Sequence, residues 1–133
     1  MIYYSKIDNS PLFSILRLSE VTEQRKDISP ETECLQVAAK KVSKGMKWPR
    51  HKHLPIERNT NKTQESWIIF SGAIRADLYD IDDSLSMTTE LFAGDMVVVY
   101  NAGHALEVLE DNTVLYEFKN GPYYGRLKDK ENF

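Results

Sequence analysis

The chain has 133 residues, of which 41% are hydrophobic and 28% charged, the composition of an ordinary globular domain. Its net charge of −3 argues against a nucleic-acid or anionic-membrane surface. The single cysteine, Cys34, cannot form an internal disulfide, and residues 1–6 lack the basic-then-apolar pattern of a signal peptide. We therefore expect one domain, residues 1–133, in the reducing cytoplasm.

The N-terminal third has the less regular pattern. Residues 11–18 resemble a strand, and the polar residues 19–27 are typical of a helical turn or loop. Ser29, Pro30 and Glu31 indicate a turn or the start of a helix. We treat residues 1–34 as an N-terminal extension of a core that spans residues 35–119.

The core contains seven short segments rich in β-branched and aromatic residues, bounded by Gly, Pro, Asn and Asp. This pattern is typical of short strands joined by turns. Regularly spaced short strands favour a sandwich or barrel over βαβ units, so the predicted fold class is all-β. The predicted strands are 33–42, 64–71, 73–80, 87–92, 96–100, 105–109 and 113–119.

The placement of the three histidines indicates a functional site. His51 and His53 flank Lys52, and in a strand residues i and i+2 point to the same face, so both imidazoles would project together. Glu65 lies on the predicted strand at 64–71, and His104 follows the predicted strand at 96–100, just past Gly103. Three imidazoles and one carboxylate form a ligand set for a divalent transition metal.

Glu65 also stands out within its own segment. It shares a strand face with Trp67 and Ile69, and a carboxylate on an apolar face is costly to bury unless it is paired or bound to a metal. His104 shares a face with Leu106 and Val108. We therefore expect both polar side chains to belong to a site.

Two motifs in the chain resemble those of the cupins. The first cupin motif is Gly, five residues, His-x-His, a spacer, Glu, six residues and Gly, and it matches residues 45–53 and 65–72. The second begins with Gly-Asp and ends with His, and it matches residues 94–104, one residue short and without the usual proline. The resemblance covers about residues 35–119, and residues 120–125 resemble the tail of a group of small bacterial cupins.

The resemblance implies a double-stranded β-helix, or jelly-roll, barrel that binds one divalent metal ion inside. Iron, manganese, nickel, cobalt, copper and zinc all accept such ligands, so the residues do not select among them. The ligands implied by the motifs are His51, His53, Glu65 and His104.

One alternative carboxylate competes with Glu65. The spacer after His53 is longer than usual, and Glu57 stands at the family's usual distance from that histidine. Glu65 has the expected distance to Gly72 and opens a predicted strand, whereas Glu57 lies in a polar loop. We therefore prefer Glu65 as the fourth ligand.

Two functions fit such a site. The first is a metal-dependent enzyme, an oxygenase or isomerase acting on a small polar molecule, with Arg50, Arg58 and Tyr116 as nearby polar groups. The second is a non-catalytic module that binds a sugar or metabolite, since some small cupins accompany surface-polysaccharide pathways. A general acid or base beside the metal would distinguish them, and Glu107, Glu117 and Tyr116 are candidates. A purely structural barrel is the weaker third interpretation.

We also expect a homodimer, with no nucleic-acid or membrane partner. An open jelly roll leaves sheet edges and an apolar outer face that must be covered. Trp48 and the predicted strand at residues 12–18 add apolar surface, and two-fold pairing is the simplest closed arrangement. The N-terminal segment is therefore predicted to contribute to the interface.

Overall fold

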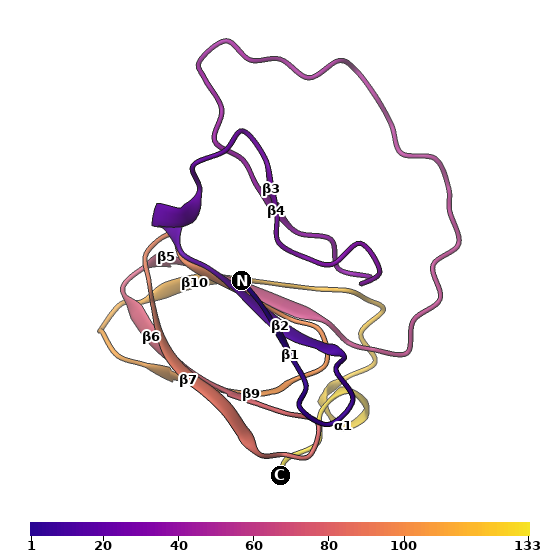
Figure 1. Cartoon of the computed structure of the whole chain (residues 1–133), viewed down its shortest axis with the longest axis vertical. Helices are drawn as coiled ribbons and strands as arrows, with labels where there is room; N and C mark the ends of the chain where they lie inside the picture. Colours follow the sequence, from indigo (N-terminus) through magenta and orange to yellow (C-terminus); the bar gives the residue numbers. More distant parts are fainter.

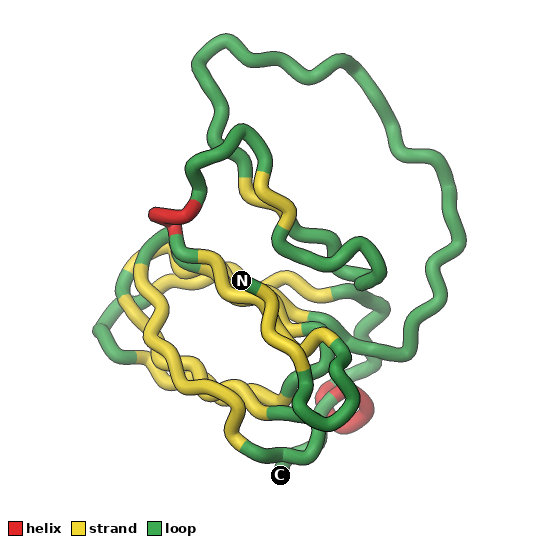
Figure 2. The backbone as a smooth tube through the Cα atoms, in the orientation of Figure 1, coloured by secondary structure: helices red, strands yellow, loops and turns green.

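A computed structural model describes all 133 residues and has antiparallel β-sheets as its main architecture (Figures 1 and 2). The helices are a 3-10 turn, η1 (Leu18–Glu20), and a short α-helix, α1 (Arg126–Asp129). Neither helix has the length and apolar character needed to span a lipid bilayer. The predicted all-β class is confirmed.

The larger sheet has five strands in the order β1-β2-β8-β5-β10, and each pair of neighbours runs antiparallel. Its middle strand, β8, is buried along its whole length because both faces of the sheet are covered there. The five strands are β1 (Ile2–Tyr4), β2 (Pro11–Leu16), β5 (Glu65–Ser71), β8 (Met96–Val99) and β10 (Val114–Lys119).

The smaller sheet has three strands in the order β7-β6-β9. Along β6 the side chains of Ile74, Ala76 and Leu78 are fully buried, whereas Arg75 is exposed, as expected where alternate residues of a strand face the core. The three strands are β6 (Ala73–Tyr79), β7 (Leu85–Phe92) and β9 (Gly103–Val108).

Most of the core lies between these two sheets. Phe13 of β2, Trp67 of β5 and Ile74 of β6 belong to one cluster of buried side chains to which both sheets contribute. A second cluster, which includes Val98 and Tyr100, lies on the opposite face of β8. A hairpin of two short strands, β3 (Lys26–Asp27) and β4 (Ala38–Ala39), packs its neighbouring residues against this second cluster.

The N-terminal third contains the strand and the helical turn expected there, β2 and η1. Residues 19–27 contain η1 and β3 with irregular chain between them. The side chains of β2, including Leu12 and Phe13 with 0% exposure, are buried in the core of their own chain. The smaller sheet covers one face of β2, and residues next to the β3–β4 hairpin cover the other, whereas Leu18 just beyond it is 58% exposed, so a role of the N-terminal segment in a dimer interface stays a prediction.

The largest difference from the predicted strands lies between β4 and β5. The predicted strand at 33–42 is reduced to Ala38–Ala39, and residues 40–63 form no strand at all. We call residues 40–63 the arm, and Figures 1 and 2 show it arching away from both sheets. Pro49 and Pro55 each lack a backbone donor for a ladder, and the arm pairs with no sheet edge that would hold it extended. The prediction that His51 and His53 lie on a strand was therefore wrong for this conformation.

Candidate functional site

Glu65 and His104 meet at one end of the space between the two sheets. Glu65 is the first residue of β5 in the larger sheet, where it pairs with Val99 on one side and Lys119 on the other. His104 is the second residue of β9 in the smaller sheet and pairs with Leu78. Glu65 Oε2 lies 3.4 Å from His104 Nε2. The two sheets thus bring together two polar side chains that are 39 positions apart in the sequence.

Glu65 is a buried carboxylate, with 4% of its surface exposed. Two ammonium groups face its other oxygen, Oε1: Lys119 Nζ donates to it at 3.2 Å, and Lys130 Nζ lies 3.8 Å away. Lys119 Nζ also donates to Asp129 Oδ2 at 3.2 Å. The negative charge of Glu65 is therefore compensated on its Oε1 side.

These contacts shift the pKa values of the partners. Desolvation lowers the pKa of Lys119, but hydrogen bonds to Asp129 and Glu65 outweigh it and hold that pKa above its ordinary value. The hydrogen bond from Lys119 lowers the pKa of Asp129. Lys119 and Asp129 thus favour their charged forms.

His104 has the opposite tendency. Burial lowers its pKa below the ordinary value of 6.5, the Glu65 carboxylate opposes that shift, and Lys130 adds to it. The imidazole also packs edge-on against the indole of Trp67, with ring centroids 4.7 Å apart. The imidazole is therefore neutral near pH 7, which is the form that binds metal ions.

Glu117 is the second carboxylate of the site. It lies opposite Trp67 in the β5–β10 register and accepts a hydrogen bond from Trp67 Nε1 at 3.2 Å. The other two candidates for a general acid or base lie elsewhere. Tyr116 is half exposed and packs against Phe70, and Glu107 forms an ion pair with Arg75.

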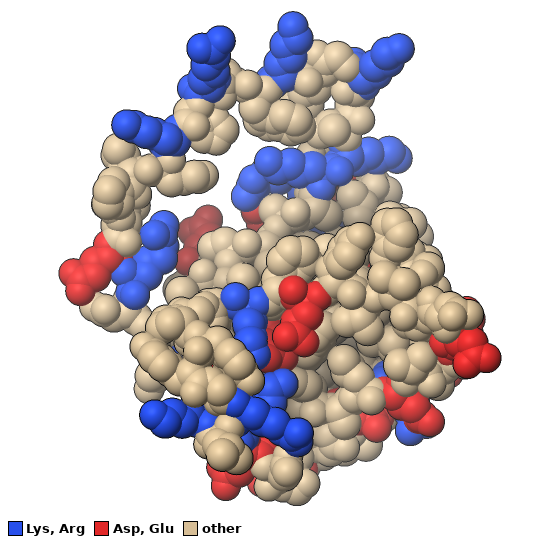
Figure 3. Space-filling view, turned by 180° about the vertical axis from the view of Figure 1, so that it is seen from behind, with Lys and Arg blue, Asp and Glu red and all other residues tan.

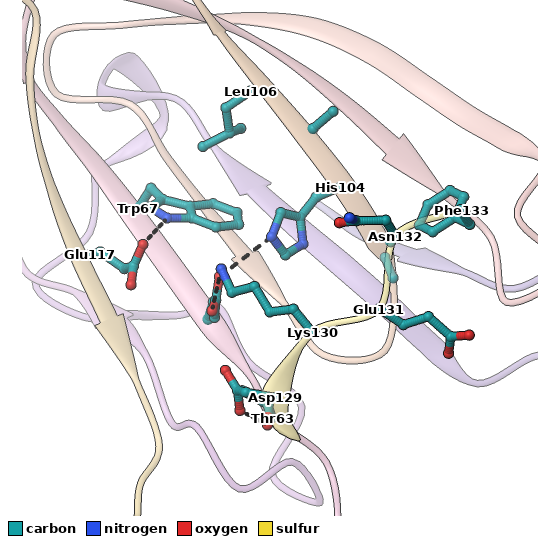
Figure 4. A pocket seen from close by; sticks show the side chains of 14 residues that line it. Thr63, Trp67, His104, Leu106, Glu117, Asp129, Lys130, Glu131, Asn132 and Phe133 are labelled. Atoms are coloured by element: carbon teal, nitrogen blue, oxygen red, sulfur yellow. Dashed lines mark hydrogen bonds and ion pairs between the residues drawn. The ribbon is translucent and has the colours of Figure 1, made fainter. Parts of the chain in front are cut away.

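A cavity of about 460 Å³, lined by 14 residues, opens beside this pair (Figure 4). Trp67, His104 and Glu117 line its sheet side, and residues 129–133 line the opposite side. We call residues 126–133 the strap. The cavity has the volume of a small-molecule site.

The arm carries the remaining predicted ligands. His51 and His53 are exposed, with ring centroids 5.7 Å apart, and His51 Nδ1 lies 2.8 Å from Pro49 O. Glu57 is also exposed on the arm and accepts a hydrogen bond from Asn59. The structure thus brings Glu65 and His104 together and holds the two arm histidines apart from them.

The buried pair offers two metal donor types. Glu65 Oε2 and His104 Nδ1 are buried side-chain atoms without a hydrogen-bond partner, and a carboxylate oxygen and an imidazole nitrogen are both metal donors. No three His, Cys, Asp or Glu side chains are grouped closely enough to hold a metal ion. The pair therefore fits half of the predicted ligand set.

Sequence reasoning missed the lysines and the strap. The position of Lys119 beside Glu65 could have been predicted from the strand register, because the two residues are opposite each other when β5 and β10 pair. Lys130 and Phe133 reach the cavity through a tail that has no strand or motif pattern. The contact of Phe133 with Tyr79, with ring centroids 5.2 Å apart, has no counterpart in the sequence pattern.

Comparisons with known proteins identify no relative. No protein-family model, no curated protein and no solved structure matches the chain.

Proposed function

We propose that the protein is a cupin-like jelly roll that binds one divalent transition metal through His51, His53, Glu65 and His104. The observation that carries the proposal is the buried pair, in which Glu65 Oε2 faces His104 Nε2 at 3.4 Å and has no hydrogen-bond partner. A buried acceptor without a donor is destabilising, and a cation would satisfy it. The motif resemblance supplies the same two residues independently.

The proposal requires the arm to fold back over the pair. His53 precedes Glu65 by twelve residues, which can span about 40 Å when extended, so the chain has ample length to return. The sheet edge at β9, which carries His104, has no partner strand. An arm that added a strand at this edge would bring its two imidazoles close to His104.

Charge supports the return of the arm. The arm has eight basic residues and one acidic residue, a net charge of +7, whereas the rest of the chain carries −10. Figure 3 shows the basic side chains spaced along the projecting segment. Four acidic residues and one lysine line the cavity, and Lys119 pairs with two of the four, so an excess of negative charge remains that attracts the arm. The four are Glu65, Glu117, Asp129 and Glu131.

Apolar exposure supports it as well. Trp48, Leu54 and Ile56 of the arm are 54%, 73% and 65% exposed. Large side chains at these exposures gain free energy when they are covered, at about 25 cal/mol per Å² of apolar area. Docking against the sheet edges would cover them.

A metal held there would act as a Lewis acid toward a carbonyl or anionic substrate. Glu117, fixed by Trp67, is the side chain placed to exchange a proton with a ligand in the cavity. An enzyme of the oxygenase or isomerase class would use Glu117 for this proton transfer. Replacing Glu117 would then abolish turnover while the metal stays bound.

Metal analysis of the purified chain tests the proposal. After removal of metal by a chelator, reloading and desalting, we expect about one divalent ion per chain. His51→Ala/His53→Ala should lose stoichiometric metal, while Lys52→Ala, between the two histidines, should retain it. Circular dichroism of each variant checks that the sheets remain folded. Undiminished metal in the double variant would rule out the assignment.

X-ray absorption of the zinc-loaded protein tests the arm directly. Three imidazole ligands are expected if the arm has returned, and one if the arm stays in the projecting conformation. A count of one would restrict the site to Glu65 and His104.

A binding module without catalysis is the second candidate. A cavity of about 460 Å³ that combines the Trp67 indole with carboxylates suits a neutral sugar or other polar metabolite. In this case Glu117→Gln would weaken binding of the ligand, and no turnover would accompany binding in the unmodified protein.

The homodimer also remains a proposal. With β2 buried, the apolar surface for a partner lies on the outer face of β5 and β10, where Phe70, Tyr116 and Phe118 are 63%, 51% and 51% exposed. Light scattering at micromolar concentration on the full chain tests it, and a particle of the chain mass, 15.4 kDa, would reject it.

A further inference from the structure

The strap forms one wall of the cavity and is fastened at three points. Asp129 accepts hydrogen bonds from Lys119 Nζ at 3.2 Å and from Thr63 Oγ1 at 3.1 Å. Lys130 reaches into the cavity toward Glu65, and Phe133 packs edge-on against Tyr79 (Figure 4). Residues 129–133 therefore cover the buried pair from the side opposite Trp67.

Of the three contacts that hold the strap, the one made by Lys130 involves the buried Glu65–His104 pair. Its ammonium lies 3.8 Å from Glu65 Oε1, and its side chain is 43% exposed, so this end of the strap is the more accessible one. Lys119, by contrast, is fixed on β10 and is 20% exposed. Of the two ammonium groups, Lys130 is the one that can leave without disturbing a sheet.

A divalent cation and Lys130 compete for the same carboxylate. A cation held by Glu65 Oε2 and His104 would lie within a few ångströms of the Lys130 ammonium, and like charges at that separation repel each other. The Lys130 ammonium compensates the negative charge of Glu65 only while no metal ion is bound there. Cation binding and closure of the strap are therefore coupled, and the coupling is reciprocal.

We propose that the strap is a cation-sensitive lid in which Lys130 is the counter-ion of Glu65 in the metal-free protein. Metal binding displaces Lys130 and loosens the strap, which opens the cavity wall to a ligand. The proposal rests on the proposed metal site at Glu65 and His104. The conformation of residues 126–133 then depends on whether the site holds a metal ion.

The decisive comparison is Lys130→Met against Lys128→Met in the full chain. Both remove one positive charge from the strap, but Lys128 is exposed and forms no ion pair. The probe is Zn²⁺ alone, with affinity measured by competition with a chelating dye. We expect Lys130→Met to bind Zn²⁺ about threefold to fivefold more tightly, the range for a partly exposed ion pair, and Lys128→Met to match the unmodified protein.

Backbone ¹⁵N relaxation of residues 126–133 gives the second readout. Zn²⁺ should lower the heteronuclear NOE of these residues in the unmodified protein, and Lys130→Met should show the low values without metal. Equal affinity gains in both variants, or a strap whose NOE is unchanged by bound Zn²⁺, would overturn the lid while leaving the metal site intact. Absence of Zn²⁺ binding in every variant would instead remove the proposed function, and the lid with it.

Discussion

Glu65 Oε2 lies 3.4 Å from His104 Nε2, and these two atoms come from different sheets. The carboxylate is compensated on its other oxygen by Lys119, whereas the imidazole is neutral because burial lowers its pKa. The pair is thus a polar contact between two β-layers whose other shared contacts are mainly apolar. Its chemistry leads to the first two predictions.

Glu65→Gln should weaken metal binding at least tenfold, on the order of 1.4 kcal/mol, because an amide oxygen is a poorer ligand than a carboxylate. Glu57→Gln is the matched change on the arm and should leave affinity within about twofold. Titration with Zn²⁺ measures both. The reverse order of effects would assign the fourth ligand to Glu57.

His104 should make folding sensitive to mild acid. Its pKa is lowered below 6.5 by burial, so above that pH both folded and unfolded chains carry a neutral imidazole. As the pH falls below 6.5 the unfolded chain takes up the proton first, and the folded state loses stability until its own lower pKa is reached. Urea unfolding in the presence of chelator at pH 7.5 and pH 5.5 measures the loss.

His104→Gln should reduce the difference in unfolding free energy between those two pH values. His53→Gln, on the exposed arm, is the control and should leave the difference unchanged. Equal behaviour of both variants would show that His104 is not buried as described.

Tyr100→Phe should destabilise the protein by about 1–2 kcal/mol. The phenol has 0% exposure, and its hydroxyl donates to Ser14 Oγ at 2.9 Å, which joins the end of β8 to β2. Burial also raises the pKa of Tyr100, so the hydroxyl stays protonated. Thermal unfolding measures the effect, and an unchanged midpoint would show that the hydroxyl is not a buried donor.

Gly72→Ala should cost about 1–3 kcal/mol. Gly72 has φ of +78° in the turn between β5 and β6, and an added Cβ would lie 2.9 Å from Thr113 Cα. Gly45→Ala is the control, since Gly45 has φ of +88° but no atom within 4 Å of an added Cβ. It should cost about 1 kcal/mol, from the left-handed backbone alone, so comparable losses in chemical denaturation would argue against the close approach at Gly72.

The strands from β5 onward were predictable from their short β-branched and aromatic runs between turn residues, and in β6 the burial also alternates with period two. Ile74, Ala76 and Leu78 face the core and Arg75 faces solvent, so local pattern and tertiary packing agree. The carboxylate of Glu65 was predictable for a related reason, since it interrupts an apolar face.

The arm was not predictable in the same way. A segment becomes a strand only when an edge accepts its backbone groups, and residues 48–56, which include two prolines, have no partner strand. The strap shows the same limit, because the Lys130–Glu65 contact joins residues 65 positions apart with no periodic signal between them.

The separation of charge between the arm and the rest of the chain gives the molecule a large electric dipole. With +7 on the arm and −10 elsewhere, its field extends into solvent until dissolved ions screen it. The screening length is about 8 Å at physiological ionic strength and about 30 Å at 0.01 M. We therefore expect low salt to draw the arm toward the sheets and high salt to release it, so the apparent affinity for the proposed metal should fall as ionic strength rises.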